Sequence, residues 1–158
     1  MIISSQAAGE VTAVRRVYFD ASAAMRYLVP SRRGHQLARE LWDLADNVVS
    51  AAITYVEVRA ALAAGRRNRY WGAPSFIRLK RAWEEAWSDV DAIDVDRVLL
   101  ARAGELAEAE GLRGMDALQL AAALASGSDI FVAADRRLCQ AAARQTHLEV
   151  LDLDQVEG

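Results

Sequence analysis

Residues 15–28 have the sequence RRVYFDASAAMRYL, in which an apolar run ends abruptly in a carboxylate, Asp20. The run 17–19 is typical of a buried β-strand, and the small residues after Asp20 lead into a helical pattern. A strand followed directly by a helix is the repeating unit of α/β folds. The unusual feature is the charge of Asp20 at the junction, because packing of the strand and the helix does not require a charge there.

The remaining sequence repeats this alternation of strand and helix. Short apolar runs bounded by polar or turn residues predict strands at 16–19, 47–50, 92–95, 130–133 and 148–151. The intervening segments have helical spacing, as in Leu37, Leu41 and Leu44. Strands that alternate with helices pair in parallel through right-handed crossovers. We therefore expect an α/β fold with a parallel central sheet of four to five strands and helices on both faces.

The composition is that of a folded protein with a single domain. The chain has 158 residues, 53% of them hydrophobic and 26% charged, and we expect one domain over 1–158 with a flexible tail at 1–13. It has no apolar run of the ~20 residues that a membrane span needs and no signal-peptide pattern, so we expect a cytoplasmic protein. The net charge of −3 gives no overall attraction to nucleic acid. The single cysteine, Cys139, excludes an internal disulfide and a thiolate metal site.

Four acidic residues fall at strand ends or helix starts, namely Asp20, Glu57, Asp116 and Asp135. Each has a structural explanation. The three aspartates occupy positions suited to a helix N-cap, and Thr54 with Glu57 forms the T-x-x-E pattern of a capping box. Asp116 is the least satisfactory as a simple cap, because it opens a helix that is apolar almost all round except for Gln119. A carboxylate in that position needs a partner.

The four acids also have a joint explanation. Ligands of open parallel sheets gather at the carboxyl ends of the strands, so these side chains are expected to converge. Two carboxylates ~4 Å apart repel by about 4 kcal/mol at an effective dielectric constant of 20, and Mg²⁺ or Mn²⁺ would relieve this repulsion. The sequence contains no P-loop, dinucleotide fingerprint, H-E-x-x-H or G-x-S-x-G motif. A divalent-cation site is therefore the main candidate for chemistry.

Four segments in order, VYFDASAAMRYL, SAAITYVEVRAAL, GMDALQLAAAL and FVAADRRL, resemble the PIN-domain ribonucleases, among them the VapC toxins of toxin–antitoxin pairs. The resemblance runs from about residue 17 to residue 151. It implies that Asp20, Glu57, Asp116 and Asp135 bind Mg²⁺ or Mn²⁺ and are catalytic. It also implies endonucleolytic hydrolysis of RNA, such as transfer RNA or another structured RNA, by a metal-activated water. The implied partners are a VapB-like antitoxin and a second copy of the chain.

Further residues are expected to support this site. Ser22 matches a small hydroxyl residue of the family, and Thr54 and Gln119 are candidates to support the acids. The basic residues Arg32, Arg33, Arg136 and Arg137 are candidates for RNA binding. The antitoxin of the family lies in a groove near the site, and the tryptophans that would line such a groove or pack in the core are Trp42, Trp71, Trp83 and Trp87.

Two departures from the family pattern are visible. Ala133 stands where a Ser or Thr usually precedes the last acid by two residues, and Gln119 stands where relatives often have His. Ala133 and the arginine clusters motivate a second hypothesis, a non-catalytic module of the same fold that binds RNA or a protein. A third hypothesis, a phosphatase with Asp20 as nucleophile, is weaker because Ser22 occupies the place of the second aspartate that such chemistry uses.

Overall fold

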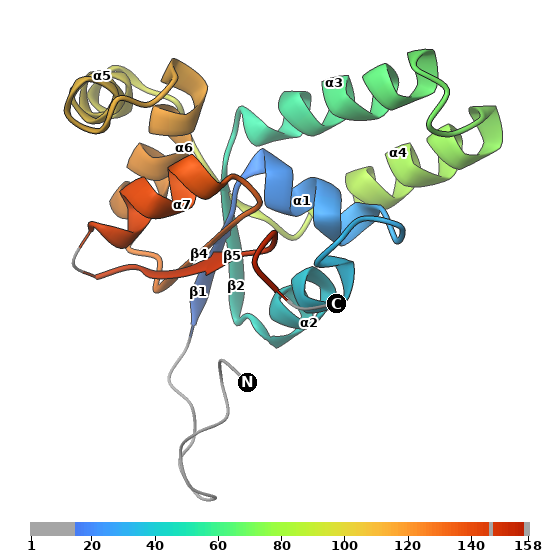
Figure 1. Cartoon of the computed structure of the whole chain (residues 1–158), viewed down its shortest axis with the longest axis horizontal. Helices are drawn as coiled ribbons and strands as arrows, with labels where there is room; N and C mark the ends of the chain where they lie inside the picture. Colours follow the sequence, from blue (N-terminus) through green and yellow to red (C-terminus); the bar gives the residue numbers. More distant parts are fainter. Residues whose placement is uncertain (1–14, 146, 157–158) are drawn as a thin grey trace, which may run out of the picture.

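Strand β1 (Arg16–Phe19), which ends one residue before Asp20, lies at the centre of a five-stranded sheet. The computed structural model describes residues 15–145 and 147–156 (Figure 1). Across the sheet the order is β3 (Asp91–Ile93), β2 (Asn47–Ala51), β1, β4 (Ile130–Ala133) and β5 (Glu149–Asp152). All four pairings are parallel, which confirms the predicted α/β fold.

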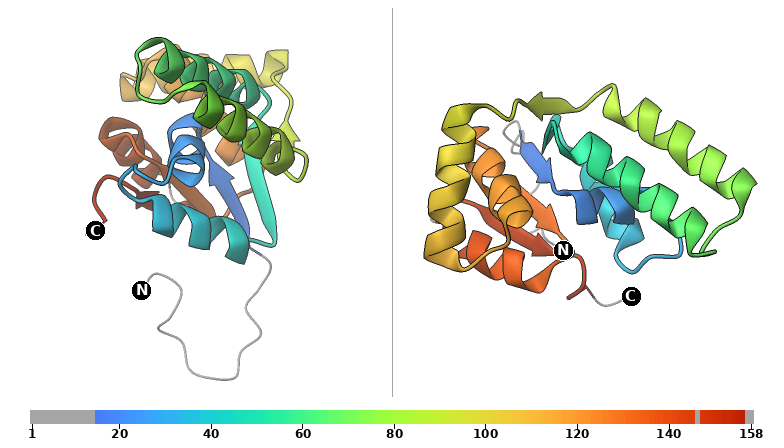
Figure 2. Two further views of the ribbon diagram at one scale, coloured as in Figure 1. Left: turned by 90° about the vertical axis from the view of Figure 1, so that its right-hand side faces the viewer. Right: turned by 90° about the horizontal axis from the view of Figure 1, so that it is seen from above.

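Helices cover both faces of the sheet. In chain order they are α1 (Ala21–Leu28), α2 (His35–Leu44), α3 (Thr54–Arg67), α4 (Ala73–Trp87), α5 (Arg97–Glu110), α6 (Gly114–Ala125) and α7 (Arg136–Ala143). Residues of α5, α6 and α7 pack on one face, and residues of α1 and α2 pack on the other. Helices α3 and α4 run side by side and extend away from the sheet beside α1 (Figures 1 and 2).

The alternation of side chains along β1 divides the core into two layers. Tyr18 faces α5–α7 and stacks on Phe131 of β4, with ring centroids 5.6 Å apart. Val17 and Phe19 face α1 and α2. All of these side chains are buried, which explains why β1 is a continuous apolar run rather than an alternating one.

A third apolar cluster joins α3 and α4 to α1. Trp83 is its largest buried side chain, and its indole N–H donates to the backbone oxygen of Tyr55 at 3.2 Å. Trp71 donates to the backbone oxygen of Leu62 at 3.0 Å, and it closes the end of the α3–α4 hairpin. Trp83 is thus a core residue, whereas Trp71 is only partly buried.

The predicted strands agree with the structure to within two residues at each end. The largest difference is β3, predicted at 92–95 and observed at Asp91–Ile93. It pairs only with β2 and lies at the edge of the sheet, so the residues after Ile93 have no second strand to extend their pairing. The tail predicted at 1–13 lies outside the described residues. Among the described residues, no helix is long and apolar enough to span a bilayer.

Gly34, between α1 and α2, lies against the backbone of Leu153, directly after β5. Gly34 has φ +76°, and a Cβ there would lie 2.8 Å from the backbone oxygen of Leu153. Gly127 has a similar φ of +64°, but its Cβ would meet no atom within 4 Å. We expect Gly127→Ala to lower the free energy of unfolding by about 1 kcal/mol, the cost of the left-handed conformation, and Gly34→Ala by about 2–4 kcal/mol because overpacking adds to it. Urea unfolding followed by circular dichroism measures both, and equal losses would contradict the close contact with Leu153.

Candidate active site

The carboxyl ends of β1 and β4 bring Asp20 and Asp135 to one edge of the sheet. The two strands are neighbours, with Phe19 in register with Val132, and the backbone N–H of Asp20 donates to the oxygen of Val132 at 3.2 Å. From β1 the chain continues to β2 on one side, whereas β4 continues to β5 on the other. Ligands of parallel sheets bind at such a switch point, so this edge is the favoured place for an active site.

Asp20 is a buried carboxylate, with only 4% of its surface exposed. Its Oδ1 accepts the hydroxyl of Ser22 at 2.6 Å and the backbone N–H of Ala23 at 2.8 Å, so the predicted N-cap of α1 is confirmed. Burial raises the pKa of Asp20 from 3.8 to about 7; the charges of Glu57 and Asp116 act in the same direction, and the two hydrogen bonds oppose it. This carboxylate therefore needs a proton or a cation.

Ser22 connects the two strand ends. Its hydroxyl donates to Asp20 and accepts the backbone N–H of Ala134 at 2.8 Å, so it joins the start of α1 to the segment after β4. This is the geometry that a residue supporting Asp20 requires. The serine or threonine of the family pattern is absent at Ala133, and the hydroxyl of Ser22 is the one that reaches the adjoining backbone.

Asp116 and Asp135 are held together by a residue that the sequence analysis missed, Arg113. Its Nε donates to Oδ2 of Asp116 at 3.0 Å and its Nη2 to Oδ2 of Asp135 at 3.4 Å. Asp135 also caps α7, as predicted, because its Oδ1 accepts the N–H of Leu138 at 2.9 Å. The predicted N-cap role of Asp116 is wrong: α6 begins at Gly114, its N-cap residue is Arg113, and Asp116 lies in the first turn.

Glu57 points to α6 rather than to the start of its own helix. Its Oε1 accepts Nε2 of Gln119 at 2.7 Å, and the same Nε2 donates to Oγ1 of Thr54 at 2.9 Å. The capping box predicted from Thr54 and Glu57 is therefore wrong; Thr54 is the first residue of α3, and the N-cap residue Ile53 has no side-chain cap bond. Partial burial raises the pKa of Glu57, the bond from Gln119 opposes this, and the charge of Asp116 adds to it.

A buried tyrosine anchors Gln119. The hydroxyl of Tyr18 donates to Oε1 of Gln119 at 2.6 Å and accepts the backbone N–H of Ala51 at 3.0 Å. The position of Glu57 is thus fixed by a chain of hydrogen bonds that begins inside the sheet. No sequence signal singled out this hydroxyl, because Tyr18 lies within an apolar run. Arg113 did leave a signal, since it precedes Asp116 by three residues, the spacing of ion pairs on a helix.

The four candidate RNA-binding arginines lie in two places. Arg136 and Arg137 begin α7 directly after Asp135; both are exposed, and Arg137 donates to the backbone oxygen of Gly111. Arg32 and Arg33 lie between α1 and α2, where Arg33 donates to the backbone oxygen of Val156 at 2.9 Å. Only Arg136 and Arg137 are on the segment that carries a candidate catalytic acid.

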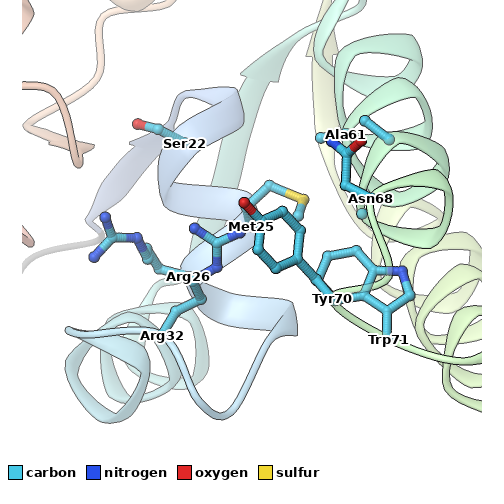
Figure 3. A pocket seen from close by; sticks show the side chains of 10 residues that line it. Ser22, Met25, Arg26, Arg32, Ala61, Asn68, Tyr70 and Trp71 are labelled. Carbon is cyan, nitrogen blue, oxygen red and sulfur yellow. The ribbon is translucent and has the colours of Figure 1, made fainter.

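A pocket opens between α1 and α3 and continues from the side of Ser22 to the end of the α3–α4 hairpin. Its volume is about 340 Å³, and its lining includes Met25, Ala61 and Trp71. Figure 3 shows Ser22, Met25 and Arg26 on α1 across from Ala61 on α3 and Asn68 directly after it, with Tyr70 and Trp71 at the far end. A second cavity of about 340 Å³ shares Tyr70 and Trp71 with this pocket. The first pocket, lined by polar and apolar side chains, is the groove between α1 and α3.

The donor atoms of this edge suit a hard divalent cation. Carboxylate oxygen is the ligand that Mg²⁺ and Mn²⁺ prefer, and Mg²⁺ is usually held by one or two carboxylates while it keeps several waters. In the described part of the chain, no group of three or more Asp, Glu, His or Cys side chains is arranged to hold a metal ion as it stands. One or two carboxylates are enough for Mg²⁺, and the buried carboxylate of Asp20 gives a reason for a cation to bind here.

The chain is similar to proteins of a known family. The model of the PIN domain matches residues 17–144. Ribonuclease VapC45 of Mycobacterium tuberculosis strain CDC 1551 and ribonuclease VapC49 of strain H37Rv are each 43% identical over 124 residues, which cover 77% of this chain and 85% of the relative.

Solved structures have the same fold. PAE2754 from Pyrobaculum aerophilum superposes with a TM-score of 0.65 at 19% identity, over 87% of this chain and 90% of its own. Mycobacterium tuberculosis VapC20, described as a sarcin-ricin loop cleaving toxin, gives 0.61 at 18% identity, over 79% and 94%. VapBC2 from Rickettsia felis, bound to promoter DNA, gives 0.56 at 15% identity, over 87% and 99%. Because the family model spans most of the chain and the ribonuclease relatives are 43% identical over 77% of it, the chain belongs to the PIN-domain family, among the VapC ribonucleases.

Proposed function

We propose that this protein is a metal-dependent endoribonuclease and the toxin of a VapBC-type pair. The observation that carries the proposal is the convergence of acidic side chains at the switch point of the sheet, around the buried carboxylate of Asp20. The name of the VapC relatives as ribonucleases supports the same reaction.

We assign the cation site to Asp20 and Asp116, with Glu57 and Asp135 completing it, and we propose Mg²⁺ or Mn²⁺ as the cation. When bound, such a cation supplies a hydroxide from a coordinated water near neutral pH and stabilises the leaving 3′ oxygen. Neighbouring residues hold the acids in position through hydrogen bonds. Ser22 and the first turn of α1 hold Asp20, and Gln119 holds Glu57 at 2.7 Å.

The substrate we propose is a structured RNA, such as a transfer RNA. VapC20, which shares the fold, is described as cleaving the sarcin-ricin loop. Arg136 and Arg137 follow Asp135 on α7 and are exposed, and we assign to their guanidinium groups contacts with RNA phosphates near the cleaved bond. The alternative, a non-catalytic module that binds RNA, would use the same arginines without strand scission.

The partner we propose for the groove between α1 and α3 is a VapB-like antitoxin. Toxin–antitoxin assemblies from Klebsiella pneumoniae and Rickettsia felis share the fold. The groove combines apolar side chains such as Met25 and Trp71 with the polar Asn68, which suits a peptide segment. The homodimer and the cytoplasmic location expected from the sequence remain predictions, which size-exclusion chromatography and cell fractionation address.

Replacing the charge of the acids without removing a helix cap tests catalysis. We expect Asp20→Asn and Asp116→Asn to lower the rate of RNA cleavage by more than about 100-fold, since loss of a group that merely supports a metal ligand already costs ~10–100-fold. The assay uses antitoxin-free protein and bulk RNA in Mn²⁺, with a chelator as negative control. Asp96→Asn is the matched control, because Asp96 caps α5 through the N–H of Leu99 at 2.8 Å and lies outside the site. Full cleavage by both site variants would rule out the proposed catalytic role.

The raised pKa of Asp20 predicts a particular pH dependence of stability in the absence of metal. Between the unfolded value of 3.8 and the folded value of about 7, the folded chain keeps a proton that the unfolded chain releases. Stability therefore falls as pH rises through this window, by at most about 1.4 kcal/mol per pH unit, and the fall ends above pH 7. Urea unfolding in chelator should show this slope in the wild type and a flatter one in Asp20→Asn. Parallel slopes would mean that Asp20 is ionised in the folded chain.

Filling the groove tests the antitoxin site. Ala64 lines the groove on α3, and we expect Ala64→Arg to lose the complex with a co-expressed small DNA-binding protein encoded immediately upstream, the arrangement expected for an antitoxin gene. Ala101→Arg adds the same side chain at an exposed position of α5 and should keep the complex. Size-exclusion chromatography measures both, and thermal melting establishes that both variants fold. A complex that survives Ala64→Arg places the antitoxin elsewhere.

A further inference from the structure

Arg113 is the cation that the structure places on the acids of the candidate site. Its guanidinium bridges Oδ2 of Asp116, in the first turn of α6, and Oδ2 of Asp135, the N-cap residue of α7. The side chain of Arg113 is 78% exposed, whereas those of Asp116 and Asp135 are 22% and 29% exposed. An arginine thus lies over the site from the solvent side and covers two of its carboxylates.

Neither the helix nor the core requires this side chain. Arg113 is the N-cap residue of α6 but makes no side-chain cap bond; its contribution to the helix is its backbone oxygen, which accepts the N–H of Ala117 at 2.9 Å. The hydrogen bond to Asp116, together with the charges of Asp116 and Asp135, raises the pKa of Arg113, so the guanidinium stays charged. Its position is therefore determined by attraction to the two carboxylates.

A divalent cation bound by the site would compete for the same oxygen atoms. Exposed ion pairs contribute little to stability, because water solvates both partners. A doubly charged ion coordinates carboxylate oxygens directly, so it can displace the guanidinium from Asp116 and Asp135 at small cost. The arginine would then be charged, unpaired and tethered at the mouth of the site, where an RNA phosphate offers oxygens that match its planar donors.

We propose that Arg113 is a phosphate-binding residue of this active site, held on Asp116 and Asp135 in the metal-free chain and released to the RNA phosphate when divalent cations replace it. The proposal rests on the function proposed above. The side chain of Arg113 then has two roles. Without metal it neutralises Asp116 and Asp135, and with metal bound it helps to position the substrate. Arg136 and Arg137 make no such contact with the carboxylates among the described interactions.

Metal binding tests the first half of the proposal without reference to activity. Calorimetric titration of the full chain with Mn²⁺, without RNA, should show about two- to tenfold tighter binding for Arg113→Ala than for the wild type, because the competitor is gone. Arg102→Ala removes the same charge from an exposed position of α5 and should bind Mn²⁺ as the wild type does. Mn²⁺ affinity that is unchanged or weaker in Arg113→Ala would overturn the proposal.

RNA binding tests the second half. With Ca²⁺ in place of Mn²⁺, anisotropy of a fluorescein-labelled single-stranded RNA of mixed sequence should show about tenfold weaker binding for Arg113→Ala. The slope of log affinity against log salt should fall by about 0.7, the value for one phosphate contact to a single strand. Binding and slope equal to those of Arg102→Ala would overturn the phosphate contact. Failure of the wild type to cleave RNA would count against the proposed function instead, since the Mn²⁺ titration still reports on Arg113.

Discussion

The parallel pairing of β1 with β4 is the constraint on which the rest of the molecule depends. These strands are adjacent in the sheet but are separated by 110 residues of chain, because β2 and β3 are added on one side before β4 and β5 are added on the other. The helices that follow both strands begin at the same edge. Their N-cap residues, Asp20 and Asp135, both lie at that edge as a result of topology, and the charges of Glu57 on α3 and Asp116 on α6 act on Asp20.

In the candidate site, one oxygen of a carboxylate can cap a helix while the other oxygen faces a charged group. In Asp135, Oδ1 caps α7 while Oδ2 meets Arg113. In Asp20 the cap bond and the bond from Ser22 both fall on Oδ1, and burial keeps the pKa near 7 despite them. A cap therefore does not exclude a catalytic role: the bond that caps the start of the helix also fixes the direction in which the remaining oxygen points.

The fold was predictable from the sequence because its signals are local. Each strand is an apolar run with turn residues on both sides, and the caps of α1 and α7 depend on a bond that spans three residues. The errors have non-local causes. Thr54 and Glu57 have the spacing of a capping box, but both bond to Gln119, which is more than 60 residues away and reaches them only after α6 packs against β2. Arg113 was missed because its pairing with Asp135 likewise appears only in the folded chain.

The hydroxyl of Tyr18 connects the middle of the sheet to the candidate site at its edge, because it bonds to Gln119, which in turn bonds to Glu57. It lies in a fully buried layer, stacked on Phe131, and it receives the amide N–H of Ala51 while it donates to Gln119. A phenylalanine would fill the same volume but would leave the buried amide N–H of Ala51 without its hydroxyl partner, at about 1–3 kcal/mol. It would also leave Oε1 of Gln119 with only the longer bond from Thr54, at 3.3 Å. Evolution of this strand is therefore restricted by atom type as well as by size, and drift in the hydrophobic core cannot be independent of the geometry of Glu57.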